Sequence, residues 1–373
     1  MAALDGLLCL SLEQAVAAPY LTSRLADKGC RVVKLERPEG DFARGYDKAA
    51  KGQSSYFVWL NRGKQSLVVD IKDPADLALL KRIAAKADIF VQNLMPGAAA
   101  RAGLGAAELR AANPRLICVD ISGYGSQGPY ARMKSYDMLL QAETGLADVT
   151  GRPEGPGRVG VSVCDIAAGM YAHQAVLEAL IARASTGQGA HIEVSLFDGM
   201  AEWMAVPLLH HDYLGKAPQR VGLAHPSIAP YSDFVTKDGV RIVISIQNER
   251  EWADFCAAVL GEPGFAAHPD FASNVQRVKN RPALDAKIAA FFAARTKDEM
   301  TALLAAARTA YGVANTVAEF SKHPQLRRVT VATPEGDVNL PAPPAIVDGD
   351  RAPALGPIPR VGEHSAAIRR EFA

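Results

Sequence analysis

Asp165 is the residue whose surroundings in the sequence most directly suggest chemistry. It stands in the segment Val161–Gly169, at the expected junction between an apolar strand and an amphipathic helix. Asp is a common helix N-cap, so the residue pattern taken alone favours a structural role. A carboxylate at this place also lies beside free backbone N–H groups and the positive end of the helix dipole. These groups keep it ionised and stabilise charge that develops next to it, so an aspartate here can act as a nucleophile.

A glycine-rich motif, Gly123-Tyr-Gly-Ser-Gln-Gly128, follows a predicted strand and matches the dinucleotide-binding pattern. Binding of a pyrophosphate would need a helix to begin at this motif. Pro129 and Tyr130 follow at once, and no acidic residue closes a second strand about 20 residues further on. The motif therefore predicts a tight glycine turn.

The cluster His210-His211-Asp212 has the residue types of a metal site. Adjacent side chains do not converge on one ion, and the sequence suggests no distant third ligand. We predict a polar helix end before Gly215 and no metal site. The sequence contains no GxSxG, HExxH or Walker motif, so hydrolase and nucleoside-triphosphatase functions lack support.

The elements that must position these residues alternate between strands and helices in the first half of the chain. Strands are expected at Leu7–Leu12, Arg31–Glu36, Ser66–Ile71, Asp88–Val91, Leu116–Ile121 and His191–Leu196. Helices are expected over Gln14–Lys28, from Asp73-Pro74 onward and over Gly169–Ala184. The alternation predicts an α/β fold with a parallel sheet covered on both faces.

The second half of the chain changes character. A linker rich in Gly, Pro and His is expected around residues 215–230, followed by a strand at Arg241–Ile246 and Ala-rich helices between Glu251 and Leu304. The Pro-rich stretch Leu340–Pro359 is expected to return to the first domain. We therefore predict a large domain over residues 1–215, a small domain over 222–305 and a return segment over 311–373.

Composition narrows the class of protein. The 373 residues include 41 Lys and Arg against 40 Asp and Glu, so the net charge of +1 offers nucleic acids or membrane surfaces no attraction. No apolar run is long enough to cross a bilayer, and the N-terminus has no basic region. The five scattered cysteines are typical of reduced core thiols. A cytoplasmic enzyme without nucleic-acid or membrane partners is expected.

Several ordered motifs give the chain a recognisable pattern. They are Leu12–Leu25, Val32–Pro38, Gly40–Gly45, Asn61–Lys64, Val91–Gly97, Gly123–Gly125, Asp165–Gly169, Gly187–Gly189 and Gly362–His364. In this order the sequence resembles the class III CoA-transferases, the CaiB/BaiF family that includes formyl-CoA transferase, over essentially its whole length. The resemblance implies a large Rossmann-like domain with a parallel sheet, a smaller α/β domain and an interlocked homodimer. It also implies acyl-CoA and small carboxylic acids as partners, with coenzyme A entering as substrate and no permanently bound cofactor.

The resemblance assigns roles to particular residues. An aspartate at the position of Asp165 attacks the acyl-CoA thioester and forms a mixed anhydride, and the returning CoA thiolate then gives an aspartyl-CoA thioester. Matching positions imply coenzyme A contacts at Gln14, Ala15, Ala17, Arg37, Lys64, Asn93, Arg101 and Lys134. Basic residues suit the phosphates of this ligand.

The expected substrates are succinyl-CoA as donor and a short dicarboxylic acid as acceptor. Arg44 is expected to pair with the second carboxylate of such an acid. Tyr136 and Asp137 are expected to face the substrate.

Two alternatives stay open at this point. The first is an alpha-methylacyl-CoA racemase, a related family that needs a His where this chain has Tyr136, in Ser135-Tyr136-Asp137. Tyr, with an ordinary pKa near 10, is poorly matched to exchanging an α-proton near neutrality, so the transferase is favoured. The second alternative is a non-catalytic acyl-CoA-binding protein, which the intact Asp165 disfavours.

Overall fold

The computed structural model describes residues 2–373 and contains a central sheet of six parallel strands. Their order across the sheet is β3, β2, β1, β4, β5, β8, and every neighbouring pair is parallel. The strands span Leu8–Leu12 (β1), Arg31–Glu36 (β2), Lys64–Val68 (β3), Ile89–Gln92 (β4), Ile117–Ser122 (β5) and His191–Ser195 (β8). The predicted α/β fold with a parallel sheet is confirmed.

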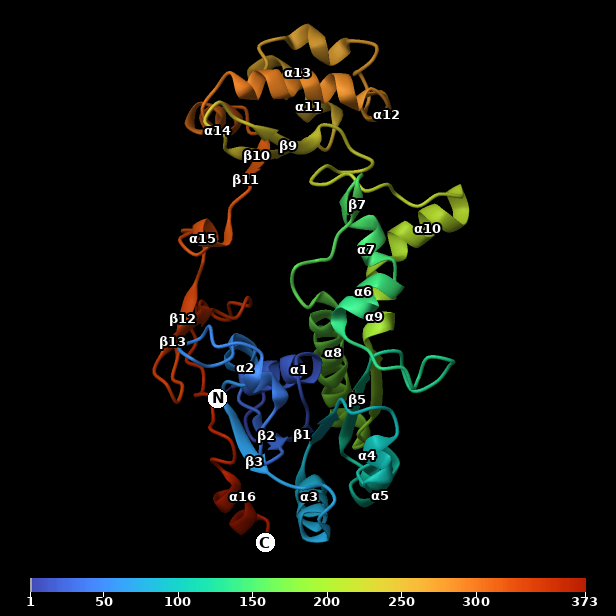
Figure 1. Cartoon of the computed structure of the whole chain (residues 1–373), viewed down its shortest axis with the longest axis vertical. Helices are drawn as coiled ribbons and strands as arrows, with labels where there is room; N and C mark the ends of the chain where they lie inside the picture. Colours follow the sequence, from blue (N-terminus) through green and yellow to red (C-terminus); the bar gives the residue numbers. More distant parts are fainter. Residues whose placement is uncertain (1) are drawn as a thin grey trace. The chain divides into compact units, whose positions relative to one another are not determined.

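Helices cover both faces of this sheet (Figure 1). Successive strand residues point to opposite faces, so Cys9 packs with one helical layer and Leu10 with the other. The first layer contains α1 (Ala17–Ala26), α8 (Val163–Thr186) and α9 (Leu196–Trp203). The second contains α3 (Pro74–Lys86), α5 (Ala106–Ala112) and α16 (Ser365–Glu371). Because both faces are covered, the inner strands β1, β4 and β5 carry buried apolar residues on both sides.

The described chain divides into two compact units. The larger unit holds the six-stranded sheet and combines the chain up to Ala147 with Arg158–Val206 and Arg327–Ala373. The smaller unit combines Asp148–Gly157 with Pro207–Leu326. The domain ranges expected from the sequence, 1–215, 222–305 and 311–373, stay a prediction.

The remaining elements of the larger unit are short. They are η1 (Phe42–Gly45), α2 (Ser55–Leu60), α4 (Ala98–Arg101), α6 (Asp137–Glu143) and the hairpin of β12 (Arg328–Val331) and β13 (Val338–Pro341). Two helices, α7 (Leu146–Val149) and α10 (Ala205–Leu214), run across unit boundaries. The chain after Arg327 returns to the large sheet, where the His364 N–H donates to the Ser66 carbonyl at 3.1 Å and the Val68 N–H donates to Ser365 Oγ at 3.0 Å.

The smaller unit has its own antiparallel sheet and core. The sheet has the order β11, β10, β9, and its core is rich in aromatic side chains, among them Trp252, Phe255 and Phe292. Its strands are β9 (Tyr231–Val235), β10 (Arg241–Ser245) and β11 (Ala310–Val313), with a two-residue pair, β6 (Gly151–Arg152) and β7 (Gly155–Pro156). Its helices are α11 (Glu249–Ala258), η2 (Pro263–Ala267), α12 (Asn274–Lys279), α13 (Arg281–Ala293), α14 (Lys297–Ala306) and α15 (Val317–Phe320).

The strand order of the sheet reverses between β1 and β4, so this is its topological switch point. Strands β2 and β3 lie on one side of β1, whereas β4, β5 and β8 lie on the other. In open parallel sheets, the carboxyl ends of strands at such a point leave a crevice for ligands. Gln14 follows β1 and Asn93 follows β4, so the topology brings both residues to this crevice.

Helices α1 and α8 approach each other closely at Gly169. A Cβ at this position would lie 2.7 Å from the Ala17 carbonyl oxygen and 2.9 Å from Tyr20 Cβ. The absent side chain therefore lets the backbone of α1 reach α8. Asp165 lies one helical turn before Gly169, so this approach also brings the first turn of α1 towards Asp165.

A buried network of charges supports the crevice from the side of β1. Glu13, which immediately precedes Gln14, accepts hydrogen bonds from Lys64 Nζ at 2.6 Å and from Lys34 Nζ at 3.4 Å. Lys34 Nζ also donates to Asp41 Oδ2 at 2.8 Å, and all four side chains are buried. Burial alone would raise the pKa of Glu13, but Lys64 and Lys34 lower it to about 2. Glu13 is therefore charged throughout the physiological range.

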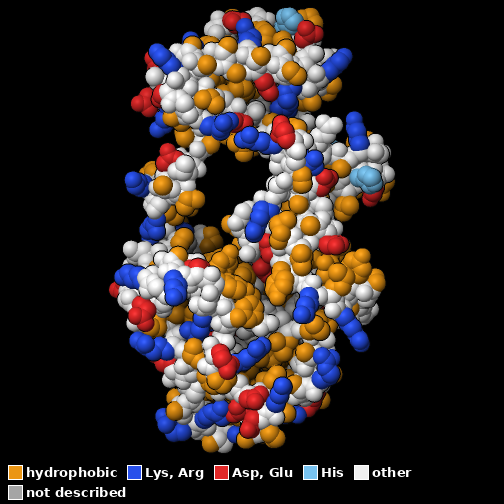
Figure 2. All heavy atoms as spheres, in the orientation of Figure 1, with side chains coloured by type: hydrophobic (Ala, Val, Ile, Leu, Met, Phe, Trp, Pro, Cys, Tyr) orange, Lys and Arg blue, Asp and Glu red, His pale blue; other side chains and the backbone are white. Residues whose placement is uncertain are grey.

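The described residues include no helix that is long and apolar enough to span a membrane. On the face drawn in Figure 2, Lys and Arg side chains are interspersed with Asp and Glu. This face therefore presents neither sign of charge as a continuous surface.

Substitution of Gly169 by Ala is expected to destabilise the protein by about 1–3 kcal/mol, because the added methyl group meets the backbone of α1. This net loss remains after the ~1 kcal/mol that Ala gains over Gly in a helix. Urea unfolding checks the prediction, with Gly45→Ala as the control because a Cβ there has open space. Equal stability of the Gly169→Ala variant and the wild type would contradict close packing at this crossing.

Substitution of Lys64 by Met is expected to lower the free energy of unfolding by about 3 kcal/mol, because it leaves Glu13 buried with a weaker partner. Thermal and urea unfolding measure this effect, and Lys216→Met, at an exposed position outside the cavities, is the control. Unchanged stability together with a raised KM for acyl-CoA would instead assign Lys64 to coenzyme A binding.

Candidate active site

Asp165 lines a cavity of about 480 Å³ in the larger unit. The cavity brings together residues from the turn after β1, the ends of β4 and β5, the start of α6 and the start of α8. Seven of the residues predicted from the sequence line it: Gln14, Ala15, Ala17, Asn93, Tyr136, Asp137 and Asp165. The topology thus gathers residues as far apart in the sequence as Gln14 and Leu196, a separation of 182 positions.

Asp165 is the third residue of α8, which begins at Val163. The apolar strand expected to end at Asp165 is absent, and the interpretation of Asp165 as a helix N-cap is wrong, because Ser162 holds that position. No described residue donates a hydrogen bond to the Asp165 side chain or forms an ion pair with it. Burial, followed by the negative charge of Asp137, raises the pKa of Asp165 from 3.8 to about 7. The carboxylate is therefore uncompensated, which suits a nucleophile.

Asp137 fixes the backbone that carries Asp165. Its Oδ1 accepts the Cys164 N–H at 2.8 Å, and its Oδ2 accepts a hydrogen bond from Gln141 Nε2 at 2.7 Å. Asp137 thereby caps the first turn of α8 from another helix, since Ser162 makes no side-chain cap. Its carboxylate is buried, and its effect on Asp165 is both positional and electrostatic.

The turn Gln14–Ala15 is held from two sides. Asn93 Oδ1 accepts the Gln14 N–H at 2.9 Å, and Asn93 Nδ2 donates to the Gln14 carbonyl at 2.8 Å. Ala15 has a φ of 62°, in the left-handed region that non-glycine residues rarely adopt. Helix α1 consequently starts at Ala17, three residues later than the predicted start at Gln14. The side chain of Asn93 is thus engaged with protein backbone at the wall of the cavity.

A neighbouring cavity of about 710 Å³ lies at the carboxyl ends of β1 and β2. Arg37 and Lys72 line it, and Gln14 and Phe42 line both this cavity and that of Asp165. The two cavities therefore adjoin at Gln14 and Phe42. Arg37 is exposed, and its predicted role as a phosphate contact stays a prediction.

Four other predicted residues lie outside the Asp165 cavity. Lys64 is buried against Glu13. Arg44 binds both carboxylate oxygens of Glu36 at 2.8 Å and the Pro359 carbonyl at 3.2 Å. Arg101 and Lys134 are exposed, and neither forms an ion pair with a described residue. Tyr136 does line the cavity, yet it is 66% exposed.

Sequence reasoning missed several residues of the cavity. Arg158 and the hydroxyl-bearing Tyr46, Ser135 and Ser162 all line it. Burial, with Asp41 and Asp165 nearby, raises the pKa of Tyr46 to about 12, so this phenol stays a hydrogen-bond donor. A signal for Arg158 was present, since it precedes Asp165 by seven residues in the loop that leads into α8.

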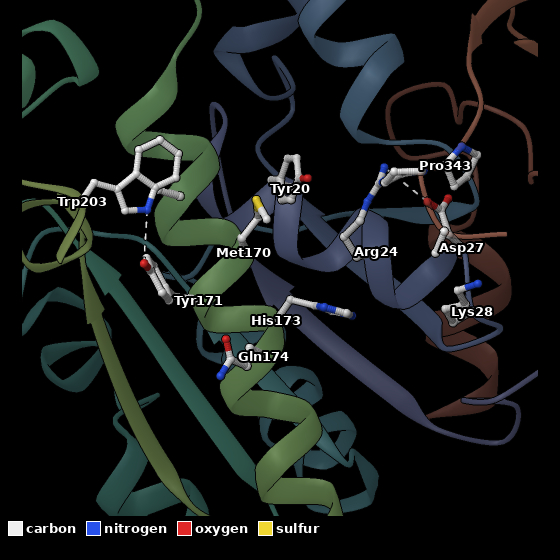
Figure 3. Close-up of a pocket in the computed structure, with 13 residues that line it drawn as sticks. Tyr20, Arg24, Asp27, Lys28, Met170, Tyr171, His173, Gln174, Trp203 and Pro343 are labelled. Carbon is white, nitrogen blue, oxygen red and sulfur yellow. Dashed lines mark hydrogen bonds and ion pairs between the residues drawn. The ribbon is translucent and has the colours of Figure 1, made fainter. Parts of the chain in front are cut away.

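A third cavity, of about 460 Å³, lies between α1, α8 and the segment Pro343–Ala345 (Figure 3). Tyr20, Met170 and Trp203 contribute to its wall. Its carboxylate, Asp27, is paired with Arg62 at 2.7 Å and with Arg24 at 3.2 Å. This cavity therefore lacks the uncompensated carboxylate that marks the Asp165 cavity.

The remaining sequence motifs have structural roles. The segment Gly123–Gly128 follows β5 as a turn in which Gly125 and Gly128 have positive φ, as predicted. His210 and His211 lie near the end of α10, before Gly215, also as predicted. A separate group on the β5–β8 edge, Asp120 with His191 and Glu193, brings three ligand-type atoms within 4.8 Å of one another. Asp120 and His191 already pair there at 2.9 Å.

Known proteins resemble this chain over its length. The signature of CoA-transferase family III matches residues 4–365. The chain is 36% identical over 373 residues to the acetyl-CoA:oxalate CoA-transferase of Acetobacter aceti, covering 99% of this chain and 95% of that protein. It is 32% identical over 376 residues to the succinyl-CoA:glutarate CoA-transferase of Homo sapiens, covering 99% and 85% of the two chains.

A solved structure has the same architecture. The crystal structure of a CaiB/BaiF family protein from Brucella suis matches with a TM-score of 0.86 and 35% identity, and the match covers 100% of both chains. The fold that contains the six-stranded parallel sheet is thus similar to that of this CaiB/BaiF family protein. The family signature and these full-length similarities show that the chain belongs to CoA-transferase family III, the class III CoA-transferases.

Proposed function

We propose that this CoA-transferase moves coenzyme A from an acyl-CoA to a short dicarboxylic acid, with Asp165 as the nucleophile. The observation that carries the proposal is the uncompensated Asp165 carboxylate in the first turn of α8, within a cavity. The helix N-terminus contributes partial positive charge beside the carboxylate, which stabilises negative charge as it develops.

The donor half of the reaction forms two acyl-enzyme species in turn. An Asp165 oxygen attacks the thioester carbonyl carbon, the carbon–sulfur bond breaks, and coenzyme A leaves as a thiolate, which gives a mixed anhydride. The thiolate then attacks the aspartyl carbonyl carbon of the anhydride. The aspartyl carbon–oxygen bond breaks, and the donor acid leaves as a carboxylate.

The acceptor half repeats these steps in the opposite order. The acceptor carboxylate attacks the aspartyl-CoA thioester, which releases the thiolate and forms a second anhydride. The thiolate attacks the acceptor carbonyl carbon, which gives the product thioester and restores the Asp165 carboxylate. Each nucleophile and leaving group is an anion, so the cycle needs no proton transfer. One thioester replaces another, so it needs no external energy source.

The two adjoining cavities suggest how coenzyme A binds. We place its phosphates near Arg37 in the larger cavity and its thioester beside Asp165, with the path between them passing Gln14. Ala15 and Ala17 line the thioester end, and Asn93 holds the turn that forms its wall. Arg101 and Lys134, both exposed, are proposed as further contacts to the phosphates.

Two observations support short dicarboxylic acids as the substrate class: the names of similar proteins and the residues that line the cavity. The similar proteins are named for oxalate and glutarate, which are short dicarboxylic acids. Tyr136 and Asp137, which line the cavity of Asp165, are proposed to face the bound acid. Succinyl-CoA is proposed as donor.

A homodimer of interlocked chains is proposed from the family resemblance. Met170, Ile181 and Trp203 are large apolar side chains exposed by 52%, 75% and 48% on α8 and α9, and a second copy would remove them from water. A cytoplasmic location is also proposed, since all five cysteines are free thiols buried in the protein.

Mixing the protein with succinyl-CoA is expected to place coenzyme A or an acyl group covalently on Asp165. Intact-protein mass spectrometry detects the adduct, and hydroxylamine trapping with peptide mapping locates it. The Asp165→Asn variant, which has the same shape but is a poor nucleophile, should stay unmodified. Adducts of equal yield on both proteins, or none on the wild type across a panel of acyl-CoAs, would refute the proposed mechanism.

The pH dependence of kcat/KM for acyl-CoA is expected to report the ionisation of Asp165. The pKa of about 7 predicts a loss of about tenfold per pH unit below pH 7 and a plateau above it, because only the carboxylate attacks. In Asp137→Asn, removal of the neighbouring negative charge should move this midpoint to lower pH. Glu202→Gln, on the exposed face of α9, is the control. An unchanged midpoint in Asp137→Asn would contradict the electrostatic role of Asp137.

A further inference from the structure

Arg158 is the basic side chain among the residues that line the Asp165 cavity. Its guanidinium has few partners. Its Nε donates to the adjacent Val159 carbonyl at 3.2 Å, and its Nη2 lies 3.8 Å from Asp137 Oδ2. The side chain is 51% exposed. An arginine carries five N–H donors, and among the described residues only the Nε donor of Arg158 has a hydrogen-bond acceptor, so its other donors are available to a ligand.

Asp137 does not satisfy Arg158. Both Asp137 oxygens already accept hydrogen bonds, from the Cys164 N–H at 2.8 Å and from Gln141 Nε2 at 2.7 Å. The separation of 3.8 Å from Arg158 is longer than a hydrogen bond. Arg158 therefore offers positive charge and directed donors to a further anion.

Other basic groups near the site are engaged elsewhere. Arg44, which the sequence suggested for this task, binds both oxygens of Glu36, and its guanidinium lies 3.7 Å from the centre of the Phe57 ring. Lys34 and Lys64 are buried in the network around Glu13. Arg158 is thus better placed than these three to meet a small anion in the cavity.

We propose that Arg158 binds the distal carboxylate of a dicarboxylic acid whose other carboxylate reacts at Asp165. This inference rests on the proposed function and names the residue that selects its substrate class. A planar guanidinium forms two parallel hydrogen bonds with a carboxylate. The methyl end of a monocarboxylic acid forms none, so Arg158 would favour dicarboxylic acids. Asp137 lies beside Arg158 and also accepts a hydrogen bond from the N–H of Cys164, the residue that precedes Asp165. Arg158 and Asp165 are therefore near each other, so an acid that reaches both has its two carboxylates close together and is short.

The test compares acids that differ only in the distal group: succinate with butyrate, and glutarate with pentanoate. In a double-displacement reaction, kcat/KM for the acceptor reports only its reaction with the aspartyl-CoA enzyme. Arg158→Gln is expected to lower this value about 10- to 100-fold for succinate and glutarate, since a hydrogen bond to a charged group is lost. The values for butyrate and pentanoate should change less than twofold. Arg158→Lys, which keeps the charge but loses the fork, should lie between Arg158→Gln and the wild type.

The matched control is Arg370→Gln, an exposed arginine on α16, which should behave as the wild type. Formation of the Asp165 adduct from succinyl-CoA in Arg158→Gln shows that the variant is folded and chemically competent. If that adduct forms, equal losses of kcat/KM for all four acids, or no loss for the two dicarboxylates, overturn the role proposed for Arg158. The proposed function is then unaffected. A raised KM for every acyl-CoA with unchanged acid preference would mean that Arg158 binds coenzyme A, and this too overturns the proposal. Absence of the adduct in the wild type overturns the proposed function and this inference together.

Discussion

The close approach of α1 and α8 at Gly169 is the constraint on which the site depends. Because Gly169 has no side chain, the Ala17 carbonyl occupies space that a Cβ would fill. The first turn of α1 and the first turn of α8 then share one cavity, which places Gln14, Ala17 and Asp165 together. The sheet supplies the crevice, but this helix crossing decides which backbone faces the carboxylate.

Two buried carboxylates near the site, Glu13 and Asp165, differ in whether a positive charge is paired with them. Glu13 has two lysine partners, so its charge is compensated within the protein. Asp165 has no such partner, and its pKa of about 7 instead of 3.8 means that ionisation opposes folding by roughly 3 to 5 kcal/mol. This cost is absent below about pH 4, grows as pH rises, and is complete above about pH 7. The compensated network beside it keeps the turn before α1 in place while Asp165 stays reactive.

The sequence predicted elements well where a local rule decides them. Strand β2 has the predicted bounds, and Asp73 caps α3 ahead of Pro74 as expected. Sequence reasoning placed Asp165 at an N-cap because it could not know that Asp137, 28 residues earlier, would supply the cap. For the same reason, the sequence could not distinguish basic residues that form ion pairs within the protein from one that is available to a ligand. Lys64 pairs with Glu13 and Arg44 with Glu36, whereas Arg158 lies 3.8 Å from Asp137 and lines the cavity. Pairing across the fold decides which charges remain available, and no spacing in the sequence encodes it.

The hydrogen bonds between β3 and the segment before α16 join residues that are synthesised at very different times. Ser66 and His364 are 298 positions apart, so at about 5–20 residues per second β3 waits roughly 15 to 60 s for its partner. During this interval its outer edge is unpaired, and such an edge is a template for pairing with other chains. The smaller unit, Asp148–Gly157 with Pro207–Leu326, is synthesised within the same interval. A nascent chain of this enzyme therefore carries an open sheet edge for most of its synthesis, and this is the stage at which a chaperone would be of most use to it.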